Sequence, residues 1–153
     1  MIQIEAVSLQ PGLAPIVAGW LVDALHRYPG GMSLAAMTAR ILAPPDGPEE
    51  TFMLFQDEQP AGTASLAAYD LDSRPDLTPW LAGVLVLPEF RGRGHAGRLV
   101  RAVADFARTQ GVARLWLYTA DADGLYAKLG WQRVGTQMGH TRMTVLMQRD
   151  LAQ

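Results

Sequence analysis

Apolar residues recur with a regular period along most of the chain, and these periods predict its secondary structure. Alternating apolar and polar residues over 2–8 predict a short strand. Residues 15–28 have apolar side chains at helical spacing, and the proline at position 15 suits a first turn. Ser33 can cap a second short helix, which runs to Leu42 and ends in the proline-rich stretch 43–48.

The middle of the chain predicts a hairpin, a buried strand and a long helix. The strand-like runs 51–56 and 62–69 are separated by a short polar stretch with a proline, which is typical of a hairpin. Residues 80–87 are apolar on both faces, so we expect this strand at the centre of the sheet. The amphipathic segment 95–110 predicts a helix, with Gly111 placed to end it.

The last part of the chain predicts a strand, a short helix and a closing pair of strands. Residues 112–118 read as a strand, and Asp121 or Asp123 can cap a short helix that ends at Leu129. The element order is strand, helix, helix, three strands, helix, strand, helix and two strands. The last two segments read as an antiparallel pair: 131–134 and 141–148.

Composition predicts one globular domain over residues 1–153. With 49% hydrophobic and 18% charged residues, the chain resembles neither a disordered segment nor a membrane protein. No apolar run reaches the roughly 18 residues of a membrane span and the start lacks a signal-peptide pattern, so we expect a cytoplasmic protein. The chain has no cysteine and three scattered histidines, so we expect no metal site.

Charge is unevenly distributed along the chain. Residues 1–90 have a net charge of −8 and residues 91–153 one of +6, although the whole chain has only −2. Chance can produce such an asymmetry with so few charges. It also suits a protein that binds an anionic ligand with one part and a cationic ligand with the other.

The most specific segment is residues 86–97, which read VLPEFRGRGHAG between the predicted central strand and the long helix. The first amides of a helix lack intrahelical acceptors and carry partial positive charge. Glycines let the backbone turn sharply and let a bulky anion approach, and arginines add charge-assisted hydrogen bonds. The segment therefore predicts a pyrophosphate site, built from these residues: Arg91, Gly92, Arg93, Gly94, Gly97 and Arg98.

Other interpretations of this turn are weaker. A dinucleotide fingerprint belongs near the start of a parallel unit, whereas this one follows mostly antiparallel strands. A nucleoside-triphosphatase loop needs Gly-Lys-Ser/Thr, which is absent. The net negative charge argues against a nucleic-acid surface. A tight turn with solvated arginines remains the structural alternative.

Two motifs in register carry a further signal. Residues 86–88 read Val-Leu-Pro, and residues 91–96 read Arg-Gly-Arg-Gly-His-Ala. Residues 125–131 read Leu-Tyr-Ala-Lys-Leu-Gly-Trp. With this element order, the chain resembles the GNAT superfamily of acyl-CoA-dependent N-acyltransferases over residues 2–148. The resemblance implies an α+β (α/β) fold, with a mixed, mostly antiparallel central sheet of about seven strands flanked by about four helices.

The resemblance also implies the cofactor and its contacts. Acetyl-CoA would be the acyl donor, with its pyrophosphate on the glycine turn and its pantetheine arm along the end of the central strand. Thr119 stands where the family often has a CoA-binding asparagine. The implied cofactor-binding residues are Leu85, Val86, Leu87, Arg91, Gly92, Arg93, Gly94, His95, Ala96, Gly97 and Thr119.

The resemblance places Tyr126 at the family's usual general acid. A tyrosine hydroxyl with a reference pKa of about 10 is protonated at neutral pH and can donate to a departing thiolate. A backbone amide near Val86 could stabilise the oxyanion. Without the motif, Tyr126 would read as a core residue that packs the helix against the sheet.

Many family members have a glutamate base on the fourth strand, but residues 80–87 contain no ionisable side chain. Candidate bases are Asp70, Asp72 and Asp76, although aspartates and prolines in this segment are also typical of a solvated turn. The aromatic residues Trp20, Tyr28 and Trp80 are mainly expected in the core. The predicted acceptor-binding residues are Trp20, Tyr28, Asp70, Asp72 and Trp80.

The sequence thus predicts an N-acetyltransferase that moves an acetyl group from acetyl-CoA to a primary amine through a tetrahedral intermediate. The acidic half favours a small cationic acceptor, and we expect neither nucleic acid nor membrane as a partner. The apolar segment 143–147 leaves room for a homodimer across a sheet edge. The missing strand carboxylate motivates the alternative, a non-enzymatic acyl-CoA sensor on the same fold.

Overall fold

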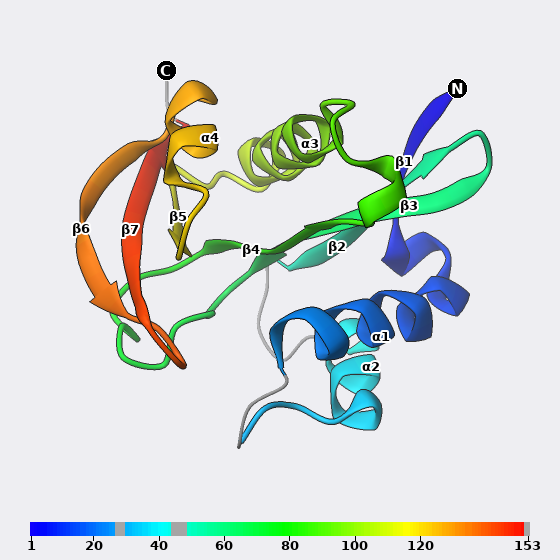
Figure 1. Cartoon of the computed structure of the whole chain (residues 1–153), viewed down its shortest axis with the longest axis horizontal. Coiled ribbons are helices and arrows are strands. Elements are labelled where there is room, and N and C mark those ends of the chain that lie inside the picture. The colour runs from blue at the N-terminus through cyan, green and yellow to red at the C-terminus, as the bar shows by residue number, and fades with distance from the viewer. Residues whose placement is uncertain (27–29, 44–48, 152–153) are drawn as a thin grey trace.

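The computed structural model of the chain describes residues 1–26, 30–43 and 49–151. Seven strands form one sheet in the order β1-β2-β3-β4-β5-β7-β6 (Figure 1). Every neighbouring pair is antiparallel except β4 and β5, which are parallel. The strands are β1 (Ile2–Ala6), β2 (Glu50–Gln56), β3 (Gln59–Ala67), β4 (Trp80–Val86), β5 (Arg114–Thr119), β6 (Gln132–Met138) and β7 (Met143–Asp150).

Within the described ranges, four α-helices and three short 3-10 turns accompany the sheet. This confirms the predicted element order and the mixed, mostly antiparallel sheet. None of these helices is long and apolar enough to cross a membrane. The helices are α1 (Ala14–Leu25), α2 (Leu34–Leu42), α3 (His95–Thr109) and α4 (Asp123–Lys128), and the 3-10 turns are η1 (Val7–Leu9), η2 (Pro11–Leu13) and η3 (Pro88–Phe90).

Helices cover both faces of the sheet. Figure 1 shows α1 and α2 on one side and α3 on the other. The alternation of side chains along β2 explains this arrangement, because successive residues point to opposite faces. Met53 packs with the cluster of α1 and α2, whereas Leu54 packs with the cluster that contains α3. Both side chains are fully buried.

Several predicted boundaries need correction. The first strand ends at Ala6 rather than at residue 8, because the buried Val7 begins a 3-10 turn. The strand predicted over 131–134 extends from Gln132 to Met138, where it is held by pairing with β7 despite its exposed side chains. The residue at the start of α4 is Ala122, so neither Asp121 nor Asp123 is its capping residue. The Ser33 cap is confirmed, since its side chain accepts a hydrogen bond from the Ala36 amide.

The sheet separates in its middle. β4 pairs with β3 along its length, but with β5 only at Trp80 and Trp116. Beyond Trp80, no strand of the described residues pairs with the edge of β4 that faces β5. Gly83, with φ of +61°, lies where the register between β3 and β4 shifts, and a β-bulge there bends the strand. This separation creates the space described next.

Candidate active site

A cavity of about 660 Å³ opens where β4 and β5 separate. Its walls include residues of β4, the end of β5 and the segment that leads into α4. The C-terminal part of α1, α2, the segment after β3 and the loop between β6 and β7 complete it. The volume is within the range of small-molecule sites, and the walls combine apolar and charged side chains.

The glycine turn lies at the end of β4 and directly precedes α3. Gly92 and Gly94 both have φ of +78°, a conformation that other residues rarely adopt. The first helical hydrogen bond runs from the Arg98 amide to the Gly94 carbonyl at 3.2 Å. Over the described part of the chain, the backbone N–H groups of residues 92–97 have no hydrogen-bond acceptor. They form a set of free donors with the positive end of the α3 dipole.

Two of the arginines stabilise this turn by donating hydrogen bonds to its backbone carbonyls and to that of β4. Arg91 Nε donates to the Val86 carbonyl at 3.0 Å, and Arg98 Nη1 donates to the Arg93 carbonyl at 2.6 Å. The Arg93 guanidinium lies 5.6 Å from the centre of the Phe90 ring. All three arginines are exposed, so they also bring positive charge to the surface of the turn.

The His95 ring points into the protein rather than toward the surface of the turn. Its side chain is only 3% exposed, with Nε2 2.7 Å from Gln56 Oε1 and Nδ1 3.1 Å from Arg98 Nη1. Since arginine can only donate, Nδ1 is the acceptor and the ring is neutral, with its proton on Nε2. Burial, and then the charges of Arg98 and Arg93, lower the pKa of His95. The ring therefore supports the turn, and only the His95 amide is available to an anion.

This arrangement predicts a pH-dependent stability. Above pH 6.5 His95 is neutral in both states, and its contribution is complete. As the pH falls below 6.5, the unfolded chain binds a proton that the folded chain resists, so the free energy of unfolding decreases. His26 acts in the same direction, because burial lowers its pKa, whereas Asp70 acts in the opposite direction, because burial raises its pKa. The test is therefore the difference between variant and parent: on going from pH 7 to pH 5, urea denaturation should show His95→Gln gaining stability relative to the parent. An equal change in variant and parent would contradict the neutral, hydrogen-bonded ring.

Tyr126 on α4 lines the cavity. The residue is 8% exposed, and its ring meets that of Trp131 edge-on at 6.2 Å. Within the described residues its hydroxyl has no hydrogen-bond partner. The hydroxyl oxygen is not fully buried, which agrees with its position at the cavity. Burial raises the pKa of Tyr126 to about 12, which keeps the hydroxyl protonated at neutral pH.

Asp70 and Asp72, in the segment after β3, line the same cavity. Burial raises the pKa of Asp70 to about 7, against the opposing charge of Arg40 and with a smaller contribution from Asp72. A carboxyl of this kind can take up and release a proton near neutral pH. Asp76 is different, because Arg74 holds it at 3.0 and 2.9 Å and lowers its pKa.

The aromatic residues predicted at the acceptor site lie elsewhere or are not described. Trp80 is fully buried and its indole donates to the Leu77 carbonyl at 2.8 Å. Trp20 packs with the cluster of α1 and α2. Neither lines the cavity. Tyr28 lies outside the described residues. The predictions for Trp20 and Trp80 are corrected accordingly, since both side chains serve packing.

Among the predicted cofactor contacts, the residues at the end of β4 bond to β3, whereas Thr119 on β5 lines the cavity. Leu85 and Val86 pair with β3, and the Leu87 amide donates to the Ala61 carbonyl at 2.9 Å. Thr119 lines the cavity, and its Oγ1 accepts a hydrogen bond from the Ala122 amide at 3.1 Å. Its hydroxyl proton is still available as a donor.

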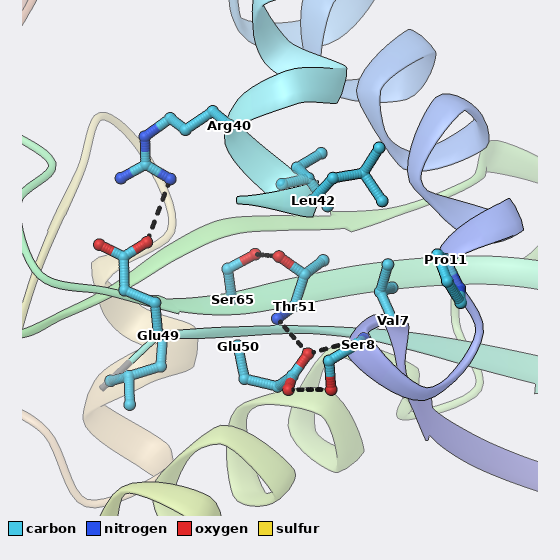
Figure 2. A pocket seen from close by; sticks show the side chains of 11 residues that line it. Val7, Ser8, Pro11, Arg40, Leu42, Glu49, Glu50, Thr51 and Ser65 are labelled. Carbon is cyan, nitrogen blue, oxygen red and sulfur yellow. Dashed lines mark hydrogen bonds and ion pairs between the residues drawn. The ribbon is translucent and has the colours of Figure 1, made fainter. Parts of the chain in front are cut away.

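Sequence patterns gave no signal for Arg40 on α2 or for its partner Glu49 before β2. Arg40 lines the same cavity as Asp70, and its charge acts on the Asp70 carboxyl. The Glu49 carboxylate lies 3.3 Å from the Arg40 guanidinium (Figure 2). The sequence offers one hint, since Arg40 is one of only three basic residues in the first 90. The partners of such a residue depend on how the helix packs, and no motif describes that.

Comparison with known proteins adds the family. The sequence model of the acetyltransferase (GNAT) family matches residues 21–131. A comparison with curated proteins finds no match.

Solved structures share the whole fold at low sequence identity. A ribosomal-protein-S18-alanine N-acetyltransferase from Escherichia coli is 19% identical with a TM-score of 0.73, covering 100% of this chain and 96% of its own. An aminoglycoside 6'-N-acetyltransferase complexed with coenzyme A is 14% identical with a TM-score of 0.77, covering 99% and 98%. A GNAT-family acetyltransferase from Streptococcus pneumoniae is 18% identical with a TM-score of 0.74, covering 99% and 100%.

Proposed function

The chain belongs to the acetyltransferase (GNAT) family and is an acyltransferase, and on that premise we propose that it moves the acetyl group of acetyl-CoA to a primary amine of a small cationic acceptor. We propose that it does so as a single domain over residues 1–153. One observation carries the proposal. A protonated hydroxyl on Tyr126 and a carboxyl on Asp70 that ionises near pH 7 line one cavity, where β4 leaves β5.

The residues present fit a coenzyme A donor. A side chain built at Gly92 would meet nothing within 4 Å, so the turn has open space above its free backbone donors. The N–H groups of residues 92–97 would hold the diphosphate, with Arg91, Arg93 and Arg98 adding charge. The bare edge of β4 beyond Trp80 would pair with the amide-rich arm. Acetyl-CoA supplies an activated thioester.

The chemistry assigned to this chain consists of two proton movements. Asp70 takes the proton that the attacking amine loses as its nitrogen bonds to the acetyl carbon. Tyr126 donates its hydroxyl proton to the sulfur as the carbon–sulfur bond breaks. Proton exchange through the open cavity restores both groups. A backbone amide of β4 would hydrogen-bond the developing oxyanion.

Charge in the cavity supports a cationic acceptor. Among the described residues, the carboxylates of Asp70, Asp72 and Asp121 line it, together with the guanidinium groups of Arg40 and Arg142. Arg142 lies 3.7 Å from Asp121, and Arg40 pairs with Glu49. Within that part of the chain neither Asp70 nor Asp72 forms an ion pair, so the cavity keeps carboxylate charge. One structural neighbour acetylates aminoglycosides, which are polyamines.

The test of this function is release of free coenzyme A from acetyl-CoA, screened against polyamines, aminoglycosides and neutral primary amines. We expect acceptor-dependent release, fastest with the polycations. Tight binding of acetyl-CoA without any acceptor-dependent release would instead support the sensor function that the missing β4 carboxylate suggests.

The proposed diphosphate site makes a separate prediction, for which the chain offers a matched control. Gly92 and Gly111 have φ of +78° and +79°, and a side chain at either would meet nothing within 4 Å. Valine at either position should cost about 1–2 kcal/mol of stability through backbone strain. Only Gly92→Val should also weaken coenzyme A binding, at least tenfold by calorimetry, because the side chain would occupy the space over the turn. Equal affinities in the two variants would exclude the turn as the site.

A further inference from the structure

Arg40 lies in a wall shared by two cavities. The second cavity, of about 180 Å³, lies between α2 and the beginning of β2 (Figure 2). Arg40, Ile41, Thr51 and Ser65 line both cavities. Arg40 is the charged member of this shared wall, with Glu49 on one side and the large cavity that contains Asp70 on the other.

The polar groups of the small cavity satisfy one another. The Glu50 carboxylate accepts hydrogen bonds from the Ser8 amide at 3.1 Å, the Ser8 hydroxyl at 2.6 Å and the Thr51 amide at 3.1 Å. The hydroxyls of Thr51 and Ser65 lie 3.0 Å apart. Among the described residues, no buried polar side-chain atom of this cavity lacks a partner. The cavity therefore needs no ligand to complete it, and its residues are supports.

Glu49 connects two parts of the chain through one buried carboxylate. Its side chain is 4% exposed. Oε1 lies 3.3 Å from Arg40 Nη1, and Oε2 accepts a hydrogen bond from the Ala68 amide at 2.9 Å. Ala68 follows β3 and precedes Asp70 by two positions. The same side chain thus holds the guanidinium on α2 and the segment that carries Asp70.

We propose that the Glu49–Arg40 ion pair is a positioning element for Asp70, which anchors the segment that bears this carboxyl and holds a cation beside it in the cavity wall. The inference rests on the proposed role of Asp70 as the base. Glu49 attracts the same guanidinium that favours the ionised form of Asp70. The pair therefore limits how strongly Arg40 can stabilise the carboxylate, and it keeps the base able to accept a proton at neutral pH.

Other groups also face Asp70, but the ion pair can be altered without them. The charge of Asp72 raises the pKa of Asp70, whereas that of Arg40 lowers it. The remaining titratable and charged groups of the cavity come from the end of α1, the segment after β3, β5 and the segment behind it, α4, and the loop between β6 and β7. Among the described residues they are His26, Tyr69, Tyr118, Asp121, Tyr126, His140 and Arg142.

The experiment is a carbon-13 NMR titration of the Asp70 carboxyl in the whole protein without ligand, assigned with Asp70→Asn. Arg40→Met removes the cation and should move the Asp70 midpoint up by about one pH unit. Glu49→Gln frees the guanidinium to pair with Asp70 and should move the midpoint down. Arg108→Met, which breaks the exposed pair with Asp105 on α3, is the matched control and should change nothing.

Opposite shifts in the two variants support the proposal. Simple loosening of the wall would hydrate Asp70 and lower its midpoint in both variants, so shifts in the same direction overturn the proposal, as would the absence of any shift. Arg40→Met leaves Glu49 buried without its cation and could prevent folding. The double variant Arg40→Met with Glu49→Gln avoids this, and its midpoint must lie above that of Glu49→Gln alone.

Turnover separates this inference from the proposed function. If Asp70 is the base, the acidic limb of the turnover profile should follow the NMR midpoints, with about tenfold lower turnover at pH 6 for Arg40→Met. NMR shifts without a matching change in the turnover profile would remove Asp70 as the base and leave its coupling to the ion pair intact.

Discussion

Replacement of Tyr126 by phenylalanine is expected to lower turnover about 100-fold while leaving coenzyme A affinity nearly unchanged. The ring still fills its place against Trp131, so the fold should be retained. What is lost is a hydroxyl that lines the cavity, has no partner within the described residues and stays protonated because burial raises the pKa of Tyr126 to about 12. Steady-state turnover and calorimetric affinity, measured on the same sample, check both parts.

The control for Tyr126 is Tyr69, which lines the same cavity but is half exposed. Tyr69→Phe removes a hydroxyl of the same type from another wall and should change turnover less than threefold, the effect of a lost contact to solvent or acceptor. If both variants lose activity equally, or if Tyr126→Phe keeps its turnover, Tyr126 is not the proton donor.

Asp70→Asn is expected to lower turnover by about two to three orders of magnitude at pH 8. In the parent enzyme, turnover should rise as the pH passes about 7, since the carboxyl accepts a proton only when ionised. The asparagine cannot ionise, so this limb should disappear from the pH profile. A limb of the same midpoint in the variant would assign it to another group.

Stability supplies an independent check on Asp70. Its folded pKa of about 7 lies above the unfolded value of 3.8, so the folded chain holds its proton longer, and the free energy of unfolding decreases as the pH rises between these values. Asp70→Asn removes this decrease and should be more stable than the parent above pH 7. Asp76→Asn, which only breaks the pair with Arg74, should change activity little. A variant that is more stable yet inactive would identify the carboxyl as functional.

The parts of the site that local chemistry dictates were accessible from the sequence. The glycine turn depends on backbone conformations of neighbouring residues, so three glycines and a following amphipathic helix suffice to predict it. Tyr126 was found through a short contiguous motif, and the cavity contains it, although its role is still a prediction. Periodicity predicted the order of strands and helices, and the resemblance to the GNAT superfamily implied the α+β fold that joins the seven strands in one sheet.

The rest depends on packing across the chain. Aromatic type left Trp80 open to two interpretations, a core residue or part of the acceptor site. The structure buries its indole, and the Leu77 carbonyl accepts a hydrogen bond from its N–H. The sequence named Asp70 as one of three acidic candidates, and it takes the structure to show that Asp70 is buried whereas Asp76 pairs with Arg74. No periodic pattern could pair Arg40 with Glu49, because the contact depends on where α2 meets the start of β2.

The contact between the two halves of the sheet has a mechanical consequence. Because β4 and β5 pair only at Trp80 and Trp116, the two parts of the sheet are connected at one point. An extended molecule bound in the opening would contact both strands along their length and connect the two parts more rigidly. The rigidity of the domain would then depend on the fraction of the protein that has acetyl-CoA bound. Protection of the β5 amides from hydrogen exchange would increase with the concentration of acetyl-CoA.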